Sequence, residues 1–340
     1  MNSEFDSKAG TNREMLAAIE AELRSILVTA GDWLEPGIEE MIVYHLGWAS
    51  PEEPQGKRIR PLLTLLCCQA AGGDWQSALP AAGAIEWIHN FSLIHDDIQD
   101  QSEIRRGRPT VWKVWGGAQA INTGDAIFAL SRWSTQRLLK NNFSPDTVLE
   151  VHRLLDETGL ALTRGQHLDI LFESTDNVTT DGYLRMIRGK TAALLKTACE
   201  LGALLSPASD RQIKNYGGFG DNLGLAFQVI DDLLGIWGSS MMTGKSSADD
   251  LQTRKKTLPI IHGLAHSIEF KQTWSAEHHS EEDIASMKDL LREIGSRQFT
   301  TQWAEHHTQE AMSSLSSANP LEPAASNLSS LAARLLQRSA

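Results

Sequence analysis

The sequence predicts an all-α fold built as a single domain. Apolar residues recur at steps of three and four, as in Met15, Ile19 and Leu23, which is the spacing of one helix face. No stretch shows the alternation of apolar and polar residues that marks a half-buried strand. Two segments, 192–205 and 223–236, are apolar on nearly all sides and should lie inside a bundle of helices.

The helices can be placed in order from the periodicity and from the residues that interrupt it. The third one, for example, should end at Gly72-Gly73, because glycine readily closes a helix. Residues 107–117 are expected as a loop, as are the polar stretches 238–249 and 274–283. No linker divides residues 1–340, and residues 1–12 are expected as a flexible terminus. The expected helices span residues 13–30, 38–46, 61–71, 78–99, 118–140, 146–172, 180–205, 210–237, 257–267, 281–294, 300–315 and 324–337.

The composition argues against several classes of partner. The 340 residues include 43 acidic and 31 basic side chains, which gives a formal net charge of −12. This charge disfavours binding to nucleic acid or to an anionic lipid surface. No stretch approaches the ~20 apolar residues of a membrane span, and the polar N-terminus does not resemble a secretory signal. The three cysteines have neither metal-binding nor disulfide spacing, so we expect a cytoplasmic protein with reduced thiols.

An acidic motif ends the expected helix 78–99. Asp96 and Asp100 lie one helical turn apart, about 40° around the axis and roughly 6 Å along it. Two such carboxylates repel unless a cation lies between them, and oxygen ligands without cysteine or histidine suit Mg²⁺ held together with phosphates. Arg105 and Arg106 follow, so the motif indicates a diphosphate site. Taken alone, a solvated acidic helix end explains it equally well, but the apolar run 84–95 before it favours a pocket.

A second acidic pair, Asp231-Asp232, also ends an apolar helix. Buried carboxylates without partners are costly, so this pair requires either basic partners in the core or a metal. A shared Mg²⁺ cluster, with the two acidic helix ends facing each other across the bundle, is the favoured hypothesis. Each basic cluster taken alone is better explained as a solvated surface patch. Together they could neutralise more than one diphosphate: 57–60, 105–106, Lys190, Lys245 and 254–256.

Over residues 50–320 the chain resembles the trans-type polyprenyl diphosphate synthases, the family of farnesyl and geranylgeranyl diphosphate synthases. The resemblance depends on several motifs in a fixed order. They are Gly56-Lys57-Arg58-Ile59-Arg60-Pro61, Asp96–Asp100 with Arg105-Arg106-Gly107, Gly124-Asp125, Gly165-Gln166-x-x-Asp169, Lys190-Thr191, Phe227-Gln228-x-x-Asp231-Asp232, and Gly244-Lys245 through Lys255.

The resemblance implies an all-α bundle of antiparallel helices around a central cavity, and a role for each matching residue. Three Mg²⁺ ions would be bound, two by Asp96 and Asp100 and the third by Asp231. Asp232 would belong to the same metal site and would help to orient it. The diphosphate of the allylic substrate would be contacted by Arg105, Lys190, Gln228 and Lys245, with Thr191 beside the allylic group and Lys255 closing over the site. The co-substrate, isopentenyl diphosphate, would be bound by Lys57, Arg60, His89 and Arg106.

The resemblance also leads to expectations about the product and the assembly. Many family members carry aspartate at the fifth position of the second acidic motif, where this chain has Gly235. Because Asp231 leads the motif, we still expect activity. Phe91 and the small Ser92, five and four residues before Asp96, predict a geranylgeranyl (C20) product, with farnesyl (C15) second. A homodimer is implied, formed through the helices around residues 118–130.

Two alternatives remain open at this stage. A terpene cyclase on the same scaffold would also ionise an allylic diphosphate, but it would not need a second diphosphate site, and the chain retains Lys57, Arg60, Arg106 and Lys255. A non-catalytic subunit of a prenyl synthase would not need an intact set of Asp96, Asp100 and Asp231.

Overall fold

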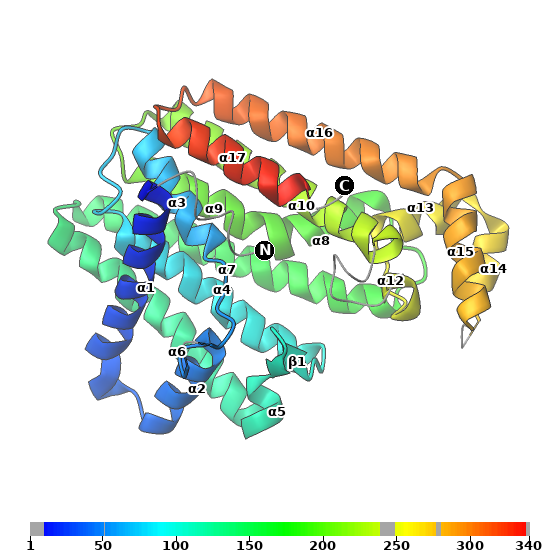
Figure 1. Cartoon of the computed structure of the whole chain (residues 1–340), viewed down its shortest axis with the longest axis horizontal. Helices are drawn as coiled ribbons and strands as arrows, with labels where there is room; N and C mark the ends of the chain where they lie inside the picture. The colour runs from blue at the N-terminus through cyan, green and yellow to red at the C-terminus, as the bar shows by residue number, and fades with distance from the viewer. Residues whose placement is uncertain (1–9, 51, 239–248, 277–279, 338–340) are drawn as a thin grey trace. The chain divides into compact units, whose positions relative to one another are not determined.

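A computed structural model describes residues 10–50, 52–238, 249–276 and 280–337 (Figure 1). The chain divides into two compact units, and each is described by itself. The first unit comprises Met1–Gly159, Thr197–Gly217 and Ala318–Leu328, and the second comprises Leu160–Lys196, Gly218–Ser317 and Ser329–Ala340. The expected flexible terminus lies outside the described residues as far as residue 9, and residues 10–12 belong to the first helix.

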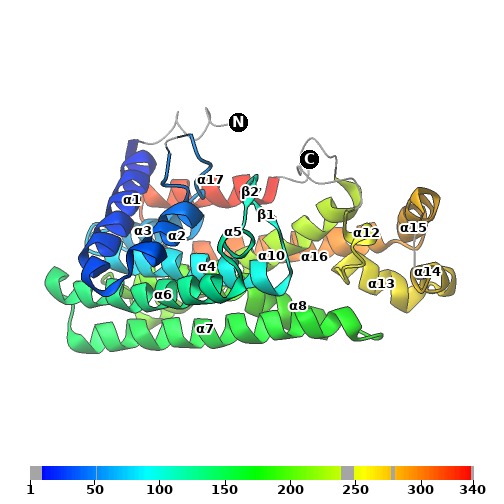
Figure 2. The same cartoon turned by 90° about the horizontal axis from the view of Figure 1, so that it is seen from below.

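The first unit is centred on two helices that run side by side, α4 (Leu79–Gln99) and α6 (Gly117–Thr135), as Figures 1 and 2 show. Its core is close-packed because small residues allow the backbones of neighbouring helices to approach each other closely. A β carbon added at Gly202 would lie 2.2 Å from the carbonyl oxygen of Thr64 on α3. The other elements are α1 (Gly10–Ala30), η1 (Gly31–Trp33), α2 (Pro36–Leu46), α3 (Ile59–Ala70), β1 (Ile104–Arg105), β2 (Arg108–Pro109), α5 (Val111–Trp115), η2 (Gln136–Asn141), and parts of α7 (Pro145–Ser174), α9 (Ala193–Leu204), α10 (Asp210–Trp237) and α17 (Ala324–Leu336).

The second unit holds the remainder of α7, α9, α10 and α17 together with a group of shorter helices. These are α8 (Thr180–Ile187), the π-helical segment η3 (Arg188–Ala192), α12 (Asp249–Gln252), α13 (Leu258–His266), α14 (Ile268–Trp274), α15 (Glu281–Glu293) and α16 (Ser296–Ser317). A buried cluster formed by Ile236, Leu251, Phe270, Met287 and Leu291, with other apolar residues, joins the end of α10 to α12–α15. Burial of this apolar surface stabilises helices that are too short to be stable alone.

The structure confirms the all-α prediction and corrects several details. Residues 111–115 form a helix rather than a loop, and Ile268–Trp274 is a helix that periodicity did not indicate. The expected helix 180–205 is interrupted by the π-helical segment η3. Two-residue strands pair Arg105 with Arg108 in a small antiparallel hairpin. The prediction of one continuous domain stays a prediction.

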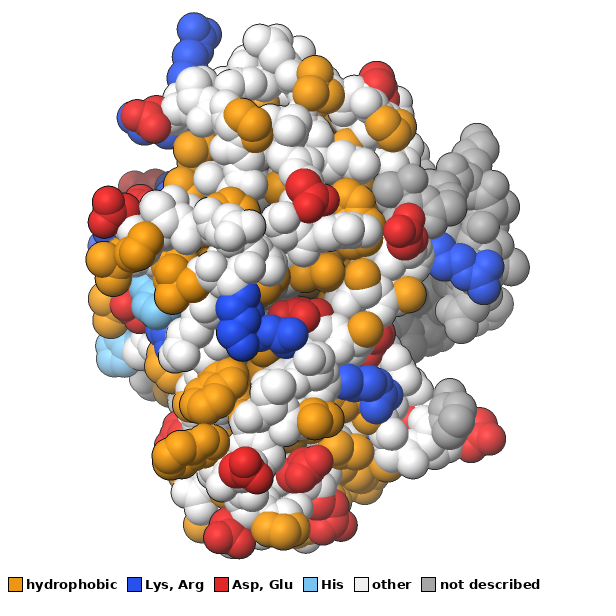
Figure 3. Space-filling model, turned by 90° about the vertical axis from the view of Figure 1, so that its left-hand side faces the viewer, with side chains coloured by type: hydrophobic (Ala, Val, Ile, Leu, Met, Phe, Trp, Pro, Cys, Tyr) orange, Lys and Arg blue, Asp and Glu red, His pale blue; other side chains and the backbone are white. Residues whose placement is uncertain are grey.

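The surface agrees with the acidic composition. On the face that Figure 3 shows, acidic and basic side chains are interspersed among apolar ones rather than gathered into a basic patch. Among the described helices, none combines the length and the apolar character that a membrane crossing requires.

Candidate active-site residues in the two units

The first acidic motif occupies the last turn of α4. Its adjacent aspartates, Asp96 and Asp97, differ in burial. Asp96 is half-buried and Asp100, the C-cap residue, is exposed. Asp97 between them is only 2% exposed, and both its oxygens accept hydrogen bonds of 2.8 Å from Nε of Arg105. Burial raises the pKa of Asp97, and Arg105 opposes that rise. Asp96 and Asp100 are therefore the more exposed carboxylates of the motif, whereas the buried Asp97 fixes Arg105.

The arginines after this motif lie on a tight hairpin. Arg106 and Gly107 have φ values of 54° and 76°, and they form the two-residue connection between β1 and β2. Two successive positive φ angles are those of a type I′ turn, which favours glycine at one of the positions. The geometry of this turn and the contact with Asp97 account for the Arg105-Arg106-Gly107 sequence. Arg105 is held by Asp97, and Arg106 lies at the turn.

A basic cluster surrounds the start of α3 in the first unit. Arg58 is the N-cap of α3, with φ at 49°, and its buried guanidinium pairs with Glu20 of α1 at 2.5 Å and Glu86 of α4 at 2.9 Å. A β carbon added at Gly56 would lie 3.0 Å from Nη1 of Arg58 and 3.1 Å from Nη2 of Arg106. Gly56 therefore lets the chain pass close to two guanidinium groups.

Arg60 and His89, both predicted to bind a diphosphate, contact each other. Nη1 of Arg60 donates a hydrogen bond of 3.2 Å to Nε2 of His89. Burial, and then the charges of Arg60 and Arg106, hold the pKa of His89 well below its usual value. His89 is therefore neutral and orients Arg60, while the predicted partner Lys57 is exposed.

The residues expected to set product length lie on α4, against α6. The ring of Phe91 packs on Phe128 with centroids 5.0 Å apart, and on His95 at 4.7 Å. Ser92 donates its hydroxyl hydrogen to the carbonyl oxygen of His89 at 2.9 Å. A β carbon added at Gly124 would lie 2.2 Å from Nε2 of His95, so glycine is required where α6 meets that ring.

The second acidic motif lies on α10 in the second unit. As in the first motif, one aspartate of the pair is buried and its neighbour is not. Asp231 is exposed, whereas Asp232 is 3% exposed and accepts hydrogen bonds from Tyr183, from the backbone N–H of Leu258 at 3.0 Å, and from Nε2 of Gln228 at 3.2 Å. Burial raises the pKa of Asp232 to about 7. The carboxylate of Asp232 thus links α8, α10 and α13, and Asp231 is the exposed member of the pair.

Lys190 and Thr191 lie in the π-helical segment η3. Nζ of Lys190 pairs with Asp169 at 2.6 Å, and the hydroxyl of Thr191 donates to Oε1 of Gln228 at 2.8 Å. The segment lies directly on α7, where a β carbon added at Gly165 would be 2.2 Å from the backbone nitrogen of Lys190. Such single-turn π segments recur at functional sites.

The two remaining predicted lysines are Lys255 and Lys245. Lys255 is exposed just after α12, and its backbone N–H donates to the carbonyl oxygen of Asp250 at 2.9 Å. Lys245 lies outside the described residues. The sequence analysis did not identify Tyr183, which donates a hydrogen bond to Asp232. No local motif marks it, because its partner lies 49 residues away in the sequence.

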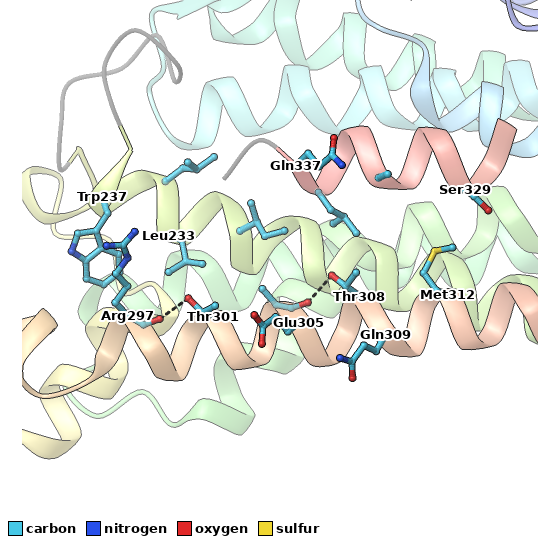
Figure 4. Close-up of a pocket in the computed structure, with 15 residues that line it drawn as sticks. Leu233, Trp237, Arg297, Thr301, Glu305, Thr308, Gln309, Met312, Ser329 and Gln337 are labelled. Carbon is cyan, nitrogen blue, oxygen red and sulfur yellow. Dashed lines mark hydrogen bonds between the residues drawn. The ribbon is translucent and has the colours of Figure 1, made fainter. Parts of the chain in front are cut away.

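A cavity of about 660 Å³ lies in the second unit between α10, α16 and α17 (Figure 4). Leu233 and Trp237 line it from α10, and Arg297 of α16 lies over the Trp237 ring at 5.9 Å. Its lining includes none of the predicted site residues. Ile230 and Leu233, which line it, flank the pair Asp231-Asp232 along α10, so different faces of this helix have different environments.

The donors present fit Mg²⁺ in chemical type. Asp96, Asp100 and Asp231 offer hard oxygen ligands, with basic side chains in both units. In the described part of the chain, no group of three His, Cys, Asp or Glu side chains could enclose a metal ion. Mg²⁺ commonly keeps waters and binds through one or two carboxylates plus substrate phosphates, so this donor set fits an ion that is bound together with a diphosphate.

Comparison with known proteins identifies the family of the chain. A profile of the polyprenyl synthetase family matches residues 47–294. A (2E,6E)-farnesyl diphosphate synthase from Mycobacterium bovis is 37% identical over 322 residues, covering 91% of this chain and 88% of that protein. The solved polyprenyl synthetase of Streptomyces coelicolor aligns with a TM-score of 0.83 at 34% identity, over 95% of this chain and 99% of that one. A geranylgeranyl pyrophosphate synthase from Corynebacterium glutamicum, complexed with isoprenyl diphosphate and magnesium, aligns with a TM-score of 0.80 at 28% identity, over 96% of this chain and 98% of that one. The chain therefore belongs to the polyprenyl synthetase family, and by that membership it is a trans-prenyltransferase.

Proposed function

We propose that the protein condenses isopentenyl diphosphate with an allylic diphosphate in a reaction that depends on Mg²⁺. The observation that carries this proposal is the end of α4, where Asp96 is half-buried and Asp100 exposed while buried Asp97 holds Arg105. A carboxylate pair and a fixed guanidinium at one helix end are suited to a diphosphate with its counter-ions. The magnesium in the complex of the Corynebacterium relative supports the choice of metal.

The proposed roles follow the chemistry of each side chain. Bound Mg²⁺, three ions in the proposal, would neutralise the charge that develops on the leaving diphosphate. The ions would be bound by Asp96, Asp100 and Asp231, with Asp232 orienting the second motif. Fixed positive charge and hydrogen bonds for the allylic diphosphate would come from Arg105, Lys190, Gln228 and Lys245, with Thr191 beside the allylic group and Lys255 closing over it.

The reaction needs charge stabilisation rather than a protein nucleophile. The allylic carbon–oxygen bond breaks, and its electron pair leaves with the diphosphate, where lysine and arginine side chains stabilise the negative charge. The double bond of isopentenyl diphosphate then supplies the electrons of the new carbon–carbon bond. A proton is lost from the neighbouring carbon to the departing diphosphate.

Isopentenyl diphosphate would be bound by the basic cluster of the first unit. Arg60, Arg106 and Lys57 would supply the positive charge. His89 would act through Arg60, because its low pKa keeps it neutral and its Nε2 accepts the Arg60 hydrogen bond. This second diphosphate site distinguishes the proposal from a terpene cyclase.

Incubation of the purified protein with Mg²⁺ and each allylic starter tests the proposal. We expect longer prenyl diphosphates and free diphosphate when isopentenyl diphosphate is present, and no product when it is left out. A hydrocarbon or alcohol made from the allylic substrate alone would indicate a cyclase instead. No elongation by the protein alone would favour a non-catalytic subunit.

We propose geranylgeranyl diphosphate (C20) as the main product, with farnesyl diphosphate (C15) next. Phe91 supports this choice, because its ring packs between Phe128 and His95 and would obstruct a chain growing along α4 from Asp96. The small Ser92 beside it leaves room for a medium chain. The names of the relatives include both lengths.

Replacing Phe91 with alanine should lengthen the product by one or more isoprene units. Removal of the ring opens space beside Phe128 while leaving Asp96 in place. Product length is measured by chromatography after the diphosphate is removed. Leu93→Ala is the matched control, because two helical steps turn its side chain about 200° away from Phe91, and its product should be unchanged. Identical products from Phe91→Ala and the unaltered protein would show that Phe91 does not limit the chain.

We also propose a homodimer formed through α6 and the helices beside it. Ile121 of α6 and Leu149 of α7 are 47% and 65% exposed in the first unit, which leaves apolar surface suited to a second copy. Light scattering after size exclusion would measure the mass of the assembly directly.

A further inference from the structure

The second acidic motif departs from the family pattern at its fifth position, Gly235, one helical turn after Asp231. A β carbon built at Gly235 would lie 2.1 Å from Oδ2, 2.5 Å from Cγ and 3.0 Å from Oδ1 of Asp250. Any larger residue would therefore displace that carboxylate. An aspartate at position 235 would place its own carboxylate close to this point, so the carboxylate of Asp250 takes nearly the place of the missing side chain.

The position of Asp250 is fixed by the residues next to it. Leu251 and Ile236, the neighbours of Asp250 and Gly235, are both fully buried in the same apolar cluster. After α12 the chain turns back, and the N–H of Lys255 bonds the Asp250 carbonyl oxygen at 2.9 Å. Burial of Leu251 thus sets α12 against the end of α10, with Asp250 facing Gly235.

The charge of Asp250 also acts on the end of α10. Burial raises the pKa of Asp232 to about 7, and the negative charge of Asp250 adds to that rise. The pKa of Tyr183, which is raised by burial and by Asp232, is raised further by Asp250. The carboxylate of Asp250 is therefore within electrostatic range of Asp232 and Tyr183.

We propose that Asp250 supplies from α12 the third carboxylate of the second acidic motif, in the space that Gly235 leaves open, and that it binds Mg²⁺ together with Asp231. Residues 231 and 235 share a helix face, because four residues make about one turn. A carboxylate at Gly235 therefore lies on the side of α10 that Asp231 presents. This inference rests on the proposed function, since it concerns the same metal.

Asp250→Asn tests the inference without depending on turnover. Mg²⁺ binding is titrated by calorimetry in the presence of inorganic pyrophosphate, with no allylic substrate. We expect the half-saturating Mg²⁺ concentration to rise about ten-fold, since asparagine keeps the size and removes the charge. The melting temperature without metal should be unchanged. Asp181→Asn, an exposed carboxylate of the same unit, is the control and should titrate like the unaltered protein.

Two further variants move the carboxylate rather than remove it. Gly235→Ala should weaken Mg²⁺ binding as Asp250→Asn does, because its methyl group displaces the Asp250 carboxylate without replacing it. The double variant Gly235→Asp with Asp250→Ala returns the carboxylate to α10 and should restore binding to within about three-fold of the unaltered protein. If Gly235→Ala does not fold, Asp250→Asn decides the question alone.

The outcomes separate this inference from the proposed function. Unaltered binding in Asp250→Asn, with normal binding by the parent protein, would overturn the role of Asp250 and leave the function intact. A folded double variant that stays as weak as Asp250→Asn would overturn the equivalence of the two positions. A parent protein that neither binds Mg²⁺ with pyrophosphate nor elongates would refute the proposed function itself.

Discussion

Asp96→Asn should lower the rate of chain elongation by about a thousand-fold and leave the melting temperature unchanged. The substitution keeps the size of the side chain and removes the charge of a half-buried carboxylate in the last turn of α4. Without it, the diphosphate must leave carbon with less of its developing charge neutralised, and loss of one such interaction costs two to three orders of magnitude, or about 3–4 kcal/mol. Release of diphosphate from saturating substrates measures the rate.

The neighbouring residue provides an internal comparison. Asp97→Asn should lower the melting temperature, because it leaves the guanidinium of Arg105 without its buried partner. Glu103→Gln, an exposed acid paired with Lys113, should change neither rate nor stability by much. More than a tenth of the normal rate in Asp96→Asn would contradict the role given to this carboxylate.

Gly165→Ala should destabilise the protein by about 3 kcal/mol and lower activity as well. Its β carbon would lie 2.2 Å from the backbone nitrogen of Lys190 and 2.6 Å from the carbonyl carbon of Gly189, both in the π-helical segment. Backbone atoms cannot move aside as a flexible side chain can, so α7 and η3 must separate. That separation would shift Lys190 and Thr191 together.

The urea midpoint and the elongation rate measure the two effects. Gly159→Ala, six residues earlier on α7, is the matched control, because its β carbon would lie at an ordinary 3.8 Å from Phe128. It should leave stability within about 1 kcal/mol, since alanine is the better helix former. Equal midpoints for Gly165→Ala and Gly159→Ala would mean that the contact between α7 and η3 is not tight.

The helical architecture could be predicted because each long helix carries its own periodicity. Asp210–Trp237 begins and ends at the predicted residues, and Pro36–Leu46 begins within two residues of its prediction. The segment Arg188–Ala192 could not be predicted as a π-helix, because its widened turn accompanies close packing on Gly165, far away in the sequence. Val111–Trp115 was missed because a five-residue helix between glycines is too short to show a period.

The helices that carry the two acidic pairs could be predicted better than the direction in which each carboxylate faces. The first Asp-Asp pair lies in the last turn of α4 as predicted, whereas α10 continues beyond the second pair to Trp237. For neither pair does the sequence say which member faces outward. Successive residues on a helix point about 100° apart, so when one carboxylate meets solvent its neighbour can turn inward. Asp97 and Asp232 turn inward because Arg105 and Tyr183 satisfy them, and both partners come from other elements.

The pairing of Arg58 with Glu20 and Glu86 bears on how the protein meets its substrates. A left-handed backbone at a residue other than glycine is strained, and here the surrounding ion pairs hold it in place. The loop that carries Lys57 and leads to Arg60 is thereby ordered before any diphosphate arrives. Most of the conformational entropy of that segment is lost when the chain folds, so little remains to be lost on association. A rigid cationic loop of this kind should favour tight capture of a small, highly charged ligand.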